Sequence, residues 1–334
     1  MMKCPKVSVV IPAYNAAATI RGTLNSFFSQ SFRDFEIIVV NDGSTDRTYE
    51  ICELLKKDSP APLHVYIQPN RGGANARNRG IELSQGKYII FMDADDIVEK
   101  DFIKKLVNAI ESKSIVDIAC CSFDLLYEDG GSKPRIIKSA KKVLSGKEAL
   151  IHLLREELEV WSGSAMYSRY LLTRFNVFFD EDVIMGEDID FRWRAFYHAR
   201  QVALVPDILV HYIQHSSSIT RALDPNRFPP SSWLDPHKFL SYLEAMGEKD
   251  KDLLQTLRGY VIPLFTVRRL RNYITYDIED LFWDSLKIEE IRNTLKRGLV
   301  SFKYNPGLAL KCFLLLCYPK AFYVRYKFNK GQYR

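Results

Sequence analysis

The feature that most constrains the fold is a regular alternation of apolar strand patterns and helical patterns as far as residue 97. The four strand patterns are VSVVI (7–11), FEIIVV (35–40), LHVYIQ (63–68) and KYIIFM (87–92). Strands that are apolar nearly throughout are typical of a parallel sheet that helices cover on both faces. The sequence therefore predicts the α/β class, with a mostly parallel sheet flanked by helices.

Short polar segments follow all four predicted strands. They are PAYN (12–15), NDGSTD (41–46), QPNRGG (68–73) and DADD (93–96). The carboxyl ends of parallel strands lie at one edge of the sheet, and ligands of α/β proteins bind beyond that edge. We therefore expect the four segments to meet and to form the functional site.

The DADD segment brings three carboxylates into four positions directly after the fourth strand. On an extended backbone, Asp93 and Asp95 point to the same side, where their like charges repel each other. Mg²⁺ or Mn²⁺ takes one or two protein carboxylates and completes its coordination with water and phosphate oxygens. The segment is therefore a candidate half-site for a divalent cation, although a solvated turn with Asp96 as a helix cap explains the same residues.

Charged side chains in three other segments extend the candidate site. Asp42 follows the second strand, where its carboxylate can accept a hydrogen bond from a nucleobase, whereas Asp46 fits a helix N-cap. Arg77 lies early in the helix after the third strand, where a guanidinium can neutralise carboxylates or hold a diphosphate. Glu187 and Asp188 offer a general base, but the dipole of a helix also favours carboxylates at its start.

Histidine and cysteine bear on metals and on the cellular compartment. His215 lies beside a Ser-rich turn and is a candidate phosphate or metal ligand, although a single histidine is more often structural. The six cysteines form no C-x-x-C pair and no zinc-ligand spacing, so we expect a reduced, cytoplasmic protein. The first residues lack the long apolar region and cleavage site of a secretory signal peptide, which agrees with that expectation.

Taken together, these segments resemble the inverting family 2 glycosyltransferases, which have the Rossmann-like GT-A fold. The resemblance covers about residues 5–220. It rests on the ordered set VSVVIPAYN, FEIIVVNDGSTD, NRGGANARNRGIELSQGKYIIFMDADD, VWSGSAMYSRYLL and GEDIDF. The chain looks like the members of the family that build bacterial surface polysaccharides.

The resemblance implies a nucleotide-sugar donor and a place for it. Asp42 would bind the base, usually uracil. Pro12 and Tyr14 would line the nucleotide pocket, and Arg77 would belong to the same nucleotide site.

The resemblance also implies a divalent cation, Mg²⁺ or Mn²⁺, beside the donor. Asp95 would bind the cation directly, while Asp93 would contact the ribose or the water shell of the metal. His215 is a further candidate ligand. Trp161 and Asp96 would lie near the donor or acceptor sugar.

Asp188 would be the catalytic base, with Glu187 as the alternative. It would take the proton of an acceptor hydroxyl as that hydroxyl attacks the anomeric carbon opposite the diphosphate, which inverts the configuration. Processive members carry transmembrane helices and a Q-x-x-R-W motif, which this sequence lacks. We therefore expect single-sugar transfer from a UDP-sugar to a saccharide acceptor that is lipid-linked.

The last third of the chain lies outside the resemblance. The proline-rich stretch at 224–236 suggests a GT-A domain at 1–223 and a mostly helical extension at 224–334. Residues 291–334 contain ten Lys or Arg residues and no Asp or Glu. Basic residues between aromatic ones favour a peripheral position on an anionic membrane surface, although a terminal helix packed on the protein explains the same pattern. No other nucleic-acid motif accompanies them, so no nucleic-acid partner is expected.

Other classes of protein fit the sequence less well. A nucleotide-dependent oxidoreductase needs G-x-G-x-x-G after the first strand, but PAYNAAATI has no glycine. A sugar-nucleotide nucleotidyltransferase usually has a Gly-rich, basic loop there, which is also missing. A non-catalytic sugar-binding relative remains an alternative, against which the intact Asp42, Asp93, Asp95 and Asp188 argue.

Overall fold

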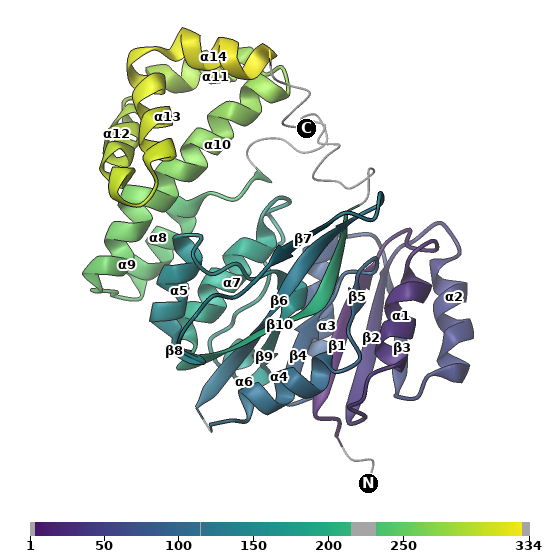
Figure 1. The fold of residues 1–334 in the computed structure, drawn as a ribbon. Coiled ribbons are helices and arrows are strands. Elements are labelled where there is room, and N and C mark those ends of the chain that lie inside the picture. Colours follow the sequence, from purple (N-terminus) through teal and green to yellow (C-terminus); the bar gives the residue numbers. More distant parts are fainter. Residues whose placement is uncertain (1–3, 114, 215–231, 329–334) are drawn as a thin grey trace. The chain divides into compact units, whose positions relative to one another are not determined.

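The computed structural model describes residues 4–113, 115–214 and 232–328, which fall into two compact units (Figure 1). The first consists of Met1–Leu153 and Leu158–Ser216, and we call it the sheet unit. The second consists of Leu154–Glu157 and Ser217–Arg334, and we call it the helical unit.

The sheet unit is built around one ten-stranded sheet with the order β3-β2-β1-β4-β9-β6-β10-β5, with β7 beside β6 and β8 beside β10. The strands β3, β2, β1 and β4 are parallel, β9 runs antiparallel between β4 and β6, and β6 is parallel to β10. The α/β prediction is confirmed, with a mixed sheet. The strands are β1 (Val7–Ala13), β2 (Phe35–Asp42), β3 (Leu63–Gln68), β4 (Tyr88–Phe91), β5 (Ile97–Val98), β6 (Val116–Tyr127), β7 (Ser132–Arg135), β8 (Val143–Ser145), β9 (Ala165–Ser168) and β10 (Gln201–Gln214).

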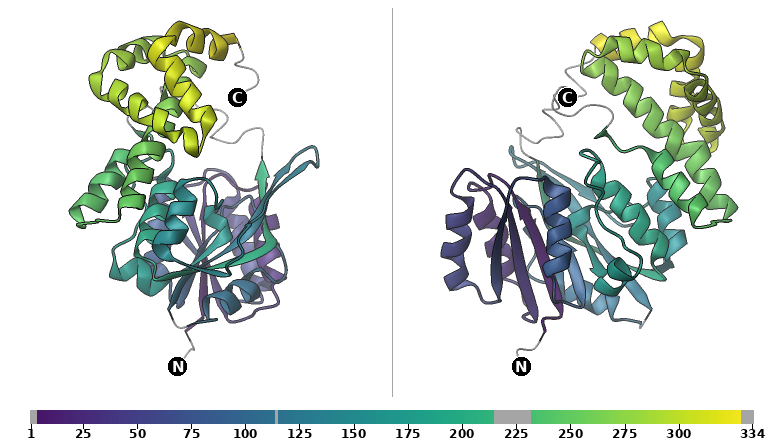
Figure 2. Two further views of the ribbon diagram at one scale, coloured as in Figure 1. Left: turned by 60° about the vertical axis from the view of Figure 1, so that its left-hand side comes forward. Right: turned by 180° about the vertical axis from the view of Figure 1, so that it is seen from behind.

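Helices cover both faces of this sheet (Figure 2). Because successive side chains of a strand alternate, Ile37 packs in the main core with α1, α2 and α4, whereas Ile38 packs with Ala76 of α3 on the opposite face. An added Cβ at Gly80 would lie 2.1 Å from Val10 Cγ1, so glycine there lets α3 lie close to β1. The helices are α1 (Ile20–Phe28), α2 (Thr48–Leu55), α3 (Gly73–Leu83), α4 (Phe102–Ile110), α5 (Gly146–Leu154), α6 (Arg169–Arg174) and α7 (Glu187–His198).

The helical unit confirms the predicted helical C-terminal region. Asp235, Asp250 and Asn305 start three of its helices by accepting hydrogen bonds from backbone N–H groups of the first turn. Its elements are α8 (Pro236–Ala245), α9 (Lys251–Thr256), the π-helical turn η4 (Leu257–Val261), α10 (Ile262–Thr275), α11 (Glu279–Lys287), α12 (Glu289–Gly298), the 3₁₀ turn η5 (Leu299–Lys303), α13 (Pro306–Cys317) and α14 (Pro319–Phe328).

In the described ranges, no single helix is both long enough and apolar enough to cross a membrane. Among the helices that the structure describes, α13 and α14 pass this test of length and composition as a pair, and the pair is bent by 117°.

Candidate functional site

Hydrogen bonds join the loops that follow the parallel strands. Asn15, after β1, accepts a hydrogen bond at Oδ1 from Thr45 N (2.8 Å), and its own N–H donates to Ser44 Oγ (3.0 Å). Ala16 N donates to Thr48 Oγ1 at 2.8 Å. These contacts hold the first two polar segments together, and we call the shared edge beyond β1–β4 the rim.

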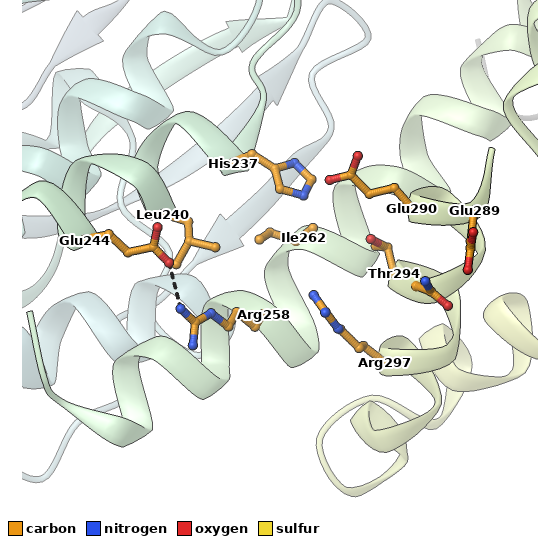
Figure 3. A pocket seen from close by; sticks show the side chains of 10 residues that line it. His237, Leu240, Glu244, Arg258, Ile262, Glu289, Glu290, Thr294 and Arg297 are labelled. Atoms are coloured by element: carbon orange, nitrogen blue, oxygen red, sulfur yellow. Dashed lines mark hydrogen bonds and ion pairs between the residues drawn. The ribbon is translucent and has the colours of Figure 1, made fainter.

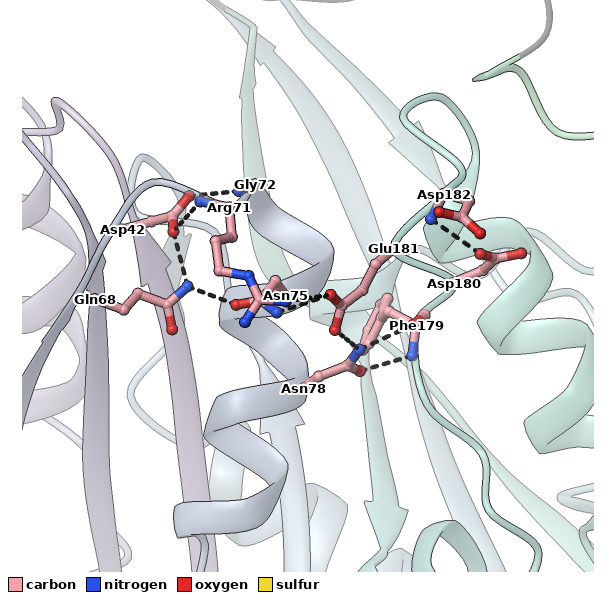
Figure 4. Close-up of polar contacts among 10 residues, drawn as sticks. All are labelled: Asp42, Gln68, Arg71, Gly72, Asn75, Asn78, Phe179, Asp180, Glu181 and Asp182. Carbon is pink, nitrogen blue, oxygen red and sulfur yellow. Dashed lines mark hydrogen bonds and ion pairs between the residues drawn. The ribbon is translucent and has the colours of Figure 1, made fainter.

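Asp42 is the last residue of β2 and is 3% exposed. Its carboxylate accepts hydrogen bonds from Gln68 Nε2 (2.8 Å), Arg71 N (2.9 Å) and Gly72 N (2.8 Å), as Figure 4 shows. The next residue, Gly43, has φ +70°, and an added Cβ would lie 2.8 Å from the N atom of the β3–α3 loop at position 70. Asp42 therefore ties this loop to the end of β2, and its contact with a base stays a prediction.

Arg77 joins three separate segments of the rim. It extends from α3, is 9% exposed, and donates to Asp93 Oδ1 (2.8 Å) and to Glu187 Oε1 (3.1 Å). Its guanidinium also lies over the ring of Phe179, 5.3 Å from the centroid. Burial opposes its charge, but Asp93 and Glu187 outweigh burial and raise the pKa of Arg77. The fourth polar segment is thus joined to the start of α7.

The three aspartates of DADD differ in environment. Asp93 and Asp95 are partly exposed, whereas Asp96 is fully buried and accepts a hydrogen bond at Oδ1 from Ile213 N (2.8 Å). Burial raises the pKa of Asp96, and the charges of Asp93 and Asp95 raise it further. Asp96 therefore reaches β10, and its contact with a sugar stays a prediction.

The same aspartates fit a divalent cation as a half-site. Burial is the main cause of the raised pKa of Asp96, and the charges of Asp93 and Asp95 add to it, so a cation at those two residues would relieve only this second contribution. Within the described ranges, no three His, Cys, Asp or Glu side chains are grouped so that they could hold a metal ion by themselves. A cation here would need substrate and water oxygens as its other ligands, which is usual for Mg²⁺.

Glu187 and Asp188 begin α7 directly after Gly186, which has φ 89°. Burial raises the pKa of Glu187, Arg77 lowers it in part, and Asp188 raises it again. Asp188 Oδ2 lies 3.1 Å from Arg192 Nη2 and 3.3 Å from Ser162 Oγ. The two neighbouring carboxylates therefore have different partners, and Ser162 and Arg192 are neighbours of Asp188 that the sequence analysis missed.

The remaining predicted residues fall on the surface or near these groups. Tyr14 is 48% exposed after β1, and Pro12 is partly exposed. The ring of Trp161, next to Ser162, stacks on Tyr212 at a centroid distance of 4.6 Å. His215 lies outside the described residues.

A second network was not predicted, and its centre is Glu181. Asn75 Nδ2 donates to Glu181 Oε2 (2.8 Å), Asn78 Nδ2 donates to Glu181 Oε1 (3.1 Å), and Arg71 Nη2 lies 3.5 Å from Oε2. Hydrogen bonds from Asn75 and Asn78 lower the pKa of Glu181. Gln68 Nε2 donates to Asn75 Oδ1 (2.8 Å) as well as to the carboxylate at position 42, so one chain of contacts crosses the rim (Figure 4).

Comparison with known proteins identifies the family. The family model described as "Glycosyl transferase family 2" matches residues 8–175, so the chain belongs to this family and the family prediction is confirmed. A relative named "Uncharacterized glycosyltransferase EpsJ", from Bacillus subtilis, is 34% identical over 223 residues, which is 65% of this chain and 63% of EpsJ. The match thus spans less than two thirds of that relative's length.

Solved structures share the fold of the chain. S. aureus TarS 1–349 in complex with UDP-GlcNAc has a TM-score of 0.64 at 18% identity, covering 98% of this chain and 92% of TarS 1–349. The mannosyltransferase PcManGT from Pyrobaculum calidifontis, in complex with GDP-Man and Mn²⁺, has a TM-score of 0.53 at 16% identity, covering 96% and 89%. At these identities the likeness concerns the fold alone, and it confirms the predicted GT-A fold.

Proposed function

We propose that the protein transfers one sugar from a UDP-sugar to a hydroxyl of a saccharide acceptor, in the synthesis of a surface polysaccharide. The observation that carries the proposal is the position of Arg77, which joins Asp93 of the DADD segment to Glu187 at the start of α7. This brings the segment proposed to hold the donor diphosphate next to the segment proposed to hold the catalytic base. Family membership and the UDP-GlcNAc complex of TarS support a nucleotide-sugar donor.

For the donor, Asp42 is proposed to accept a hydrogen bond from the base, with Pro12 and Tyr14 lining the nucleotide pocket. A carboxylate has about four acceptor positions, and three hydrogen bonds leave one for the base. The cationic Arg77 stabilises the negative charge of the departing diphosphate.

Asp95 and Asp93 are proposed to hold Mg²⁺ or Mn²⁺. A cation bound there neutralises charge on the diphosphate of the donor. The Mn²⁺ complex of PcManGT supports a metal-dependent reaction.

Asp188 is proposed as the general base and Glu187 as a positioning residue. Among the described residues, both contacts of Asp188 reach Oδ2, so Oδ1 can accept the proton of the acceptor hydroxyl. Oε1 of Glu187 accepts from Arg77, and this bond fixes the start of α7. Arg192 and Ser162 orient the base, so that it deprotonates the hydroxyl on the face opposite the diphosphate and the configuration inverts.

Product analysis tests the reaction class. With a panel of nucleotide sugars and saccharide acceptors, the protein should release UDP, and a chelator should abolish the release. Release of pyrophosphate would instead identify a nucleotidyltransferase, and donor binding without any release would identify a non-catalytic relative.

A peripheral position on the cytoplasmic face of the membrane, beside a lipid-linked acceptor, is the second part of the proposal. Apolar side chains stand exposed in the helical unit among Lys and Arg residues, such as Phe302 (68%) and Phe313 (43%). Exposed aromatic and basic residues together favour an anionic lipid surface.

Flotation with anionic liposomes tests the membrane contact. Deleting α13 and α14 is not suitable, because Leu308 and Cys312 are buried there and their loss would disturb the core. The double variant Phe302→Ser, Phe313→Ser should instead lose binding, whereas Tyr170→Ser, an exposed aromatic of the sheet unit, should keep it. Equal flotation of both variants would exclude the contact.

A further inference from the structure

The helical unit contains a cavity of about 630 Å³ between α8, η4, α10 and α12, with a mostly apolar wall and charged side chains around it (Figure 3). Basic and acidic side chains both line this cavity. The basic ones are His237, Arg258 and Arg297, and the acidic ones are Glu244, Glu289 and Glu290. The volume lies within the range of small-molecule sites, roughly 300–1,000 Å³.

A second cavity of about 390 Å³ adjoins the first, because both are lined by Arg258 and Arg297. Its other charged lining residue is Lys251, and no carboxylate is among the residues described as lining it. Positive charge is therefore concentrated where the cavities meet, while the carboxylates are confined to the larger cavity.

The two shared arginines differ in their contacts. Arg258 Nη2 lies 2.7 Å from Glu244 Oε1. Arg297 is exposed, and its side chain makes no hydrogen bond or ion pair within residues 4–113, 115–214 and 232–328. In Figure 3 the Arg297 side chain points into the cavity, on the side of Arg258. Its guanidinium can therefore give all its donors to a ligand.

The backbone at this junction is unusual as well. Arg258 and Gly259 belong to the π-helical turn η4, which interrupts the helix between α9 and α10. Such turns are rare and often occur at functional sites. An added Cβ at Gly259 would meet nothing within 4 Å, so this part of the wall is open.

We propose that the two cavities bind an anionic saccharide, with its phosphate or carboxylate group at Arg297, Arg258 and Lys251. Guanidinium groups bind both anions in a bidentate manner. The sugar hydroxyls donate to Glu289 and Glu290 in the larger cavity. Binding at this site does not depend on the transfer reaction. That the bound saccharide is also the acceptor of the transfer is the second step of the proposal, and this step rests on the function proposed above.

Calorimetry on the full chain tests the site with four probes: glucose 1-phosphate, glucuronate, glucose and inorganic phosphate. One of the two anionic sugars should bind at millimolar concentration, and whichever binds more tightly identifies the anion. Arg297→Ala should weaken this binding at least about tenfold, because a charge-assisted contact is lost. Arg292→Ala removes an exposed arginine of the same helix that lines neither cavity, and it should bind as the unchanged protein does.

Three results would overturn the site. The first is that neither anionic sugar binds, and the second is that glucose or inorganic phosphate binds as tightly as the better of the two anionic sugars. The third is that Arg297→Ala and Arg292→Ala weaken binding equally. The acceptor role has its own readout. Arg297→Ala should raise KM for the acceptor and leave donor hydrolysis without acceptor unchanged. If the unchanged protein releases no UDP, the proposed function fails, while probe binding still decides the site.

Discussion

The rim of the sheet unit and the cavities of the helical unit use arginine in opposite ways. Arg77 is 9% exposed and fixed between Asp93 and Glu187, whereas Arg297 is exposed and without a polar partner in the described part of the chain. A fixed arginine holds a site in shape before a ligand arrives, while an unpaired one keeps its donors for the ligand. Loss of the fixed Arg77 should therefore lower the stability of the fold, and loss of the unpaired Arg297 should alter ligand binding alone.

The largest effect should come from the residue that we propose as the general base. Asp188→Asn keeps the size of the side chain but removes the proton acceptor, so kcat should fall about 10²- to 10⁴-fold. Binding of the nucleotide sugar, measured by calorimetry, should not change. Asp58→Asn, at an exposed carboxylate of the same unit, serves as the control. Unchanged kcat in Asp188→Asn with a loss in Glu187→Gln would exchange the two roles.

The two arginines themselves give the second test. Arg77→Ala should lower the free energy of unfolding by about 2–3 kcal/mol, because two partly buried carboxylates lose their partner. Arg77→Lys should recover only part of this, since one ammonium replaces a fork that reaches two carboxylates. Arg297→Ala should change the same quantity by less than about 0.5 kcal/mol. Urea unfolding followed by tryptophan fluorescence measures the free energy of unfolding of all three variants. Equal losses in the two alanine variants would contradict the distinction between a fixed and an unpaired arginine.

Glu181 tests whether the rim is preorganised across its width. Its two oxygens accept from Asn75 and Asn78, and a glutamine offers only one accepting oxygen, so at least one bond is lost. Glu181→Gln should raise KM for the donor about tenfold, the equivalent of one neutral hydrogen bond, with little change in kcat. Glu82→Gln, on the exposed side of α3, should leave both constants unchanged. A fall in kcat alone would instead link Glu181 to the chemical step.

The fold of the sheet unit was largely predictable, because its parallel strands are apolar on both faces and the polar loops must then share one edge. β9 was not predicted as an antiparallel strand between β4 and β6. Its four residues pair with segments far away in the sequence, and local patterns contain no trace of such pairing.

The sequence indicated which residues to consider for the site, but not which of them contact one another. The contact between Arg77 and Glu187 joins residues 110 positions apart. Helix α3 buries Asn75 and Arg77 as well as apolar residues, so its polar residues look solvent-facing in the sequence. Less of the helical unit could be predicted from the sequence, because its cavities depend on how short helices with irregular apolar patterns pack together.

The smallest expected effect concerns the pH dependence of stability, for which one histidine from each unit is compared. Burial opposes the charge of His211, but hydrogen bonds to Glu99 and Asp124 outweigh it and raise its pKa. The hydrogen bond to Asp235 raises the pKa of His237, which is more exposed. A pKa raised on folding stabilises the protein fully below the unfolded value of 6.5, and the contribution disappears as the pH rises through the folded pKa.

The unchanged protein should therefore lose stability as the pH rises above 6.5 and through the folded pKa of each histidine, by roughly 1 kcal/mol from His211 and by less from His237. His211→Gln should flatten this pH dependence more than His237→Gln, because Glu99 and Asp124 hold His211 from two sides. Urea midpoints across this pH range measure both. A steeper loss in the absence of His211 would mean that its carboxylate partners, and not the imidazolium, set the pH response of the sheet unit.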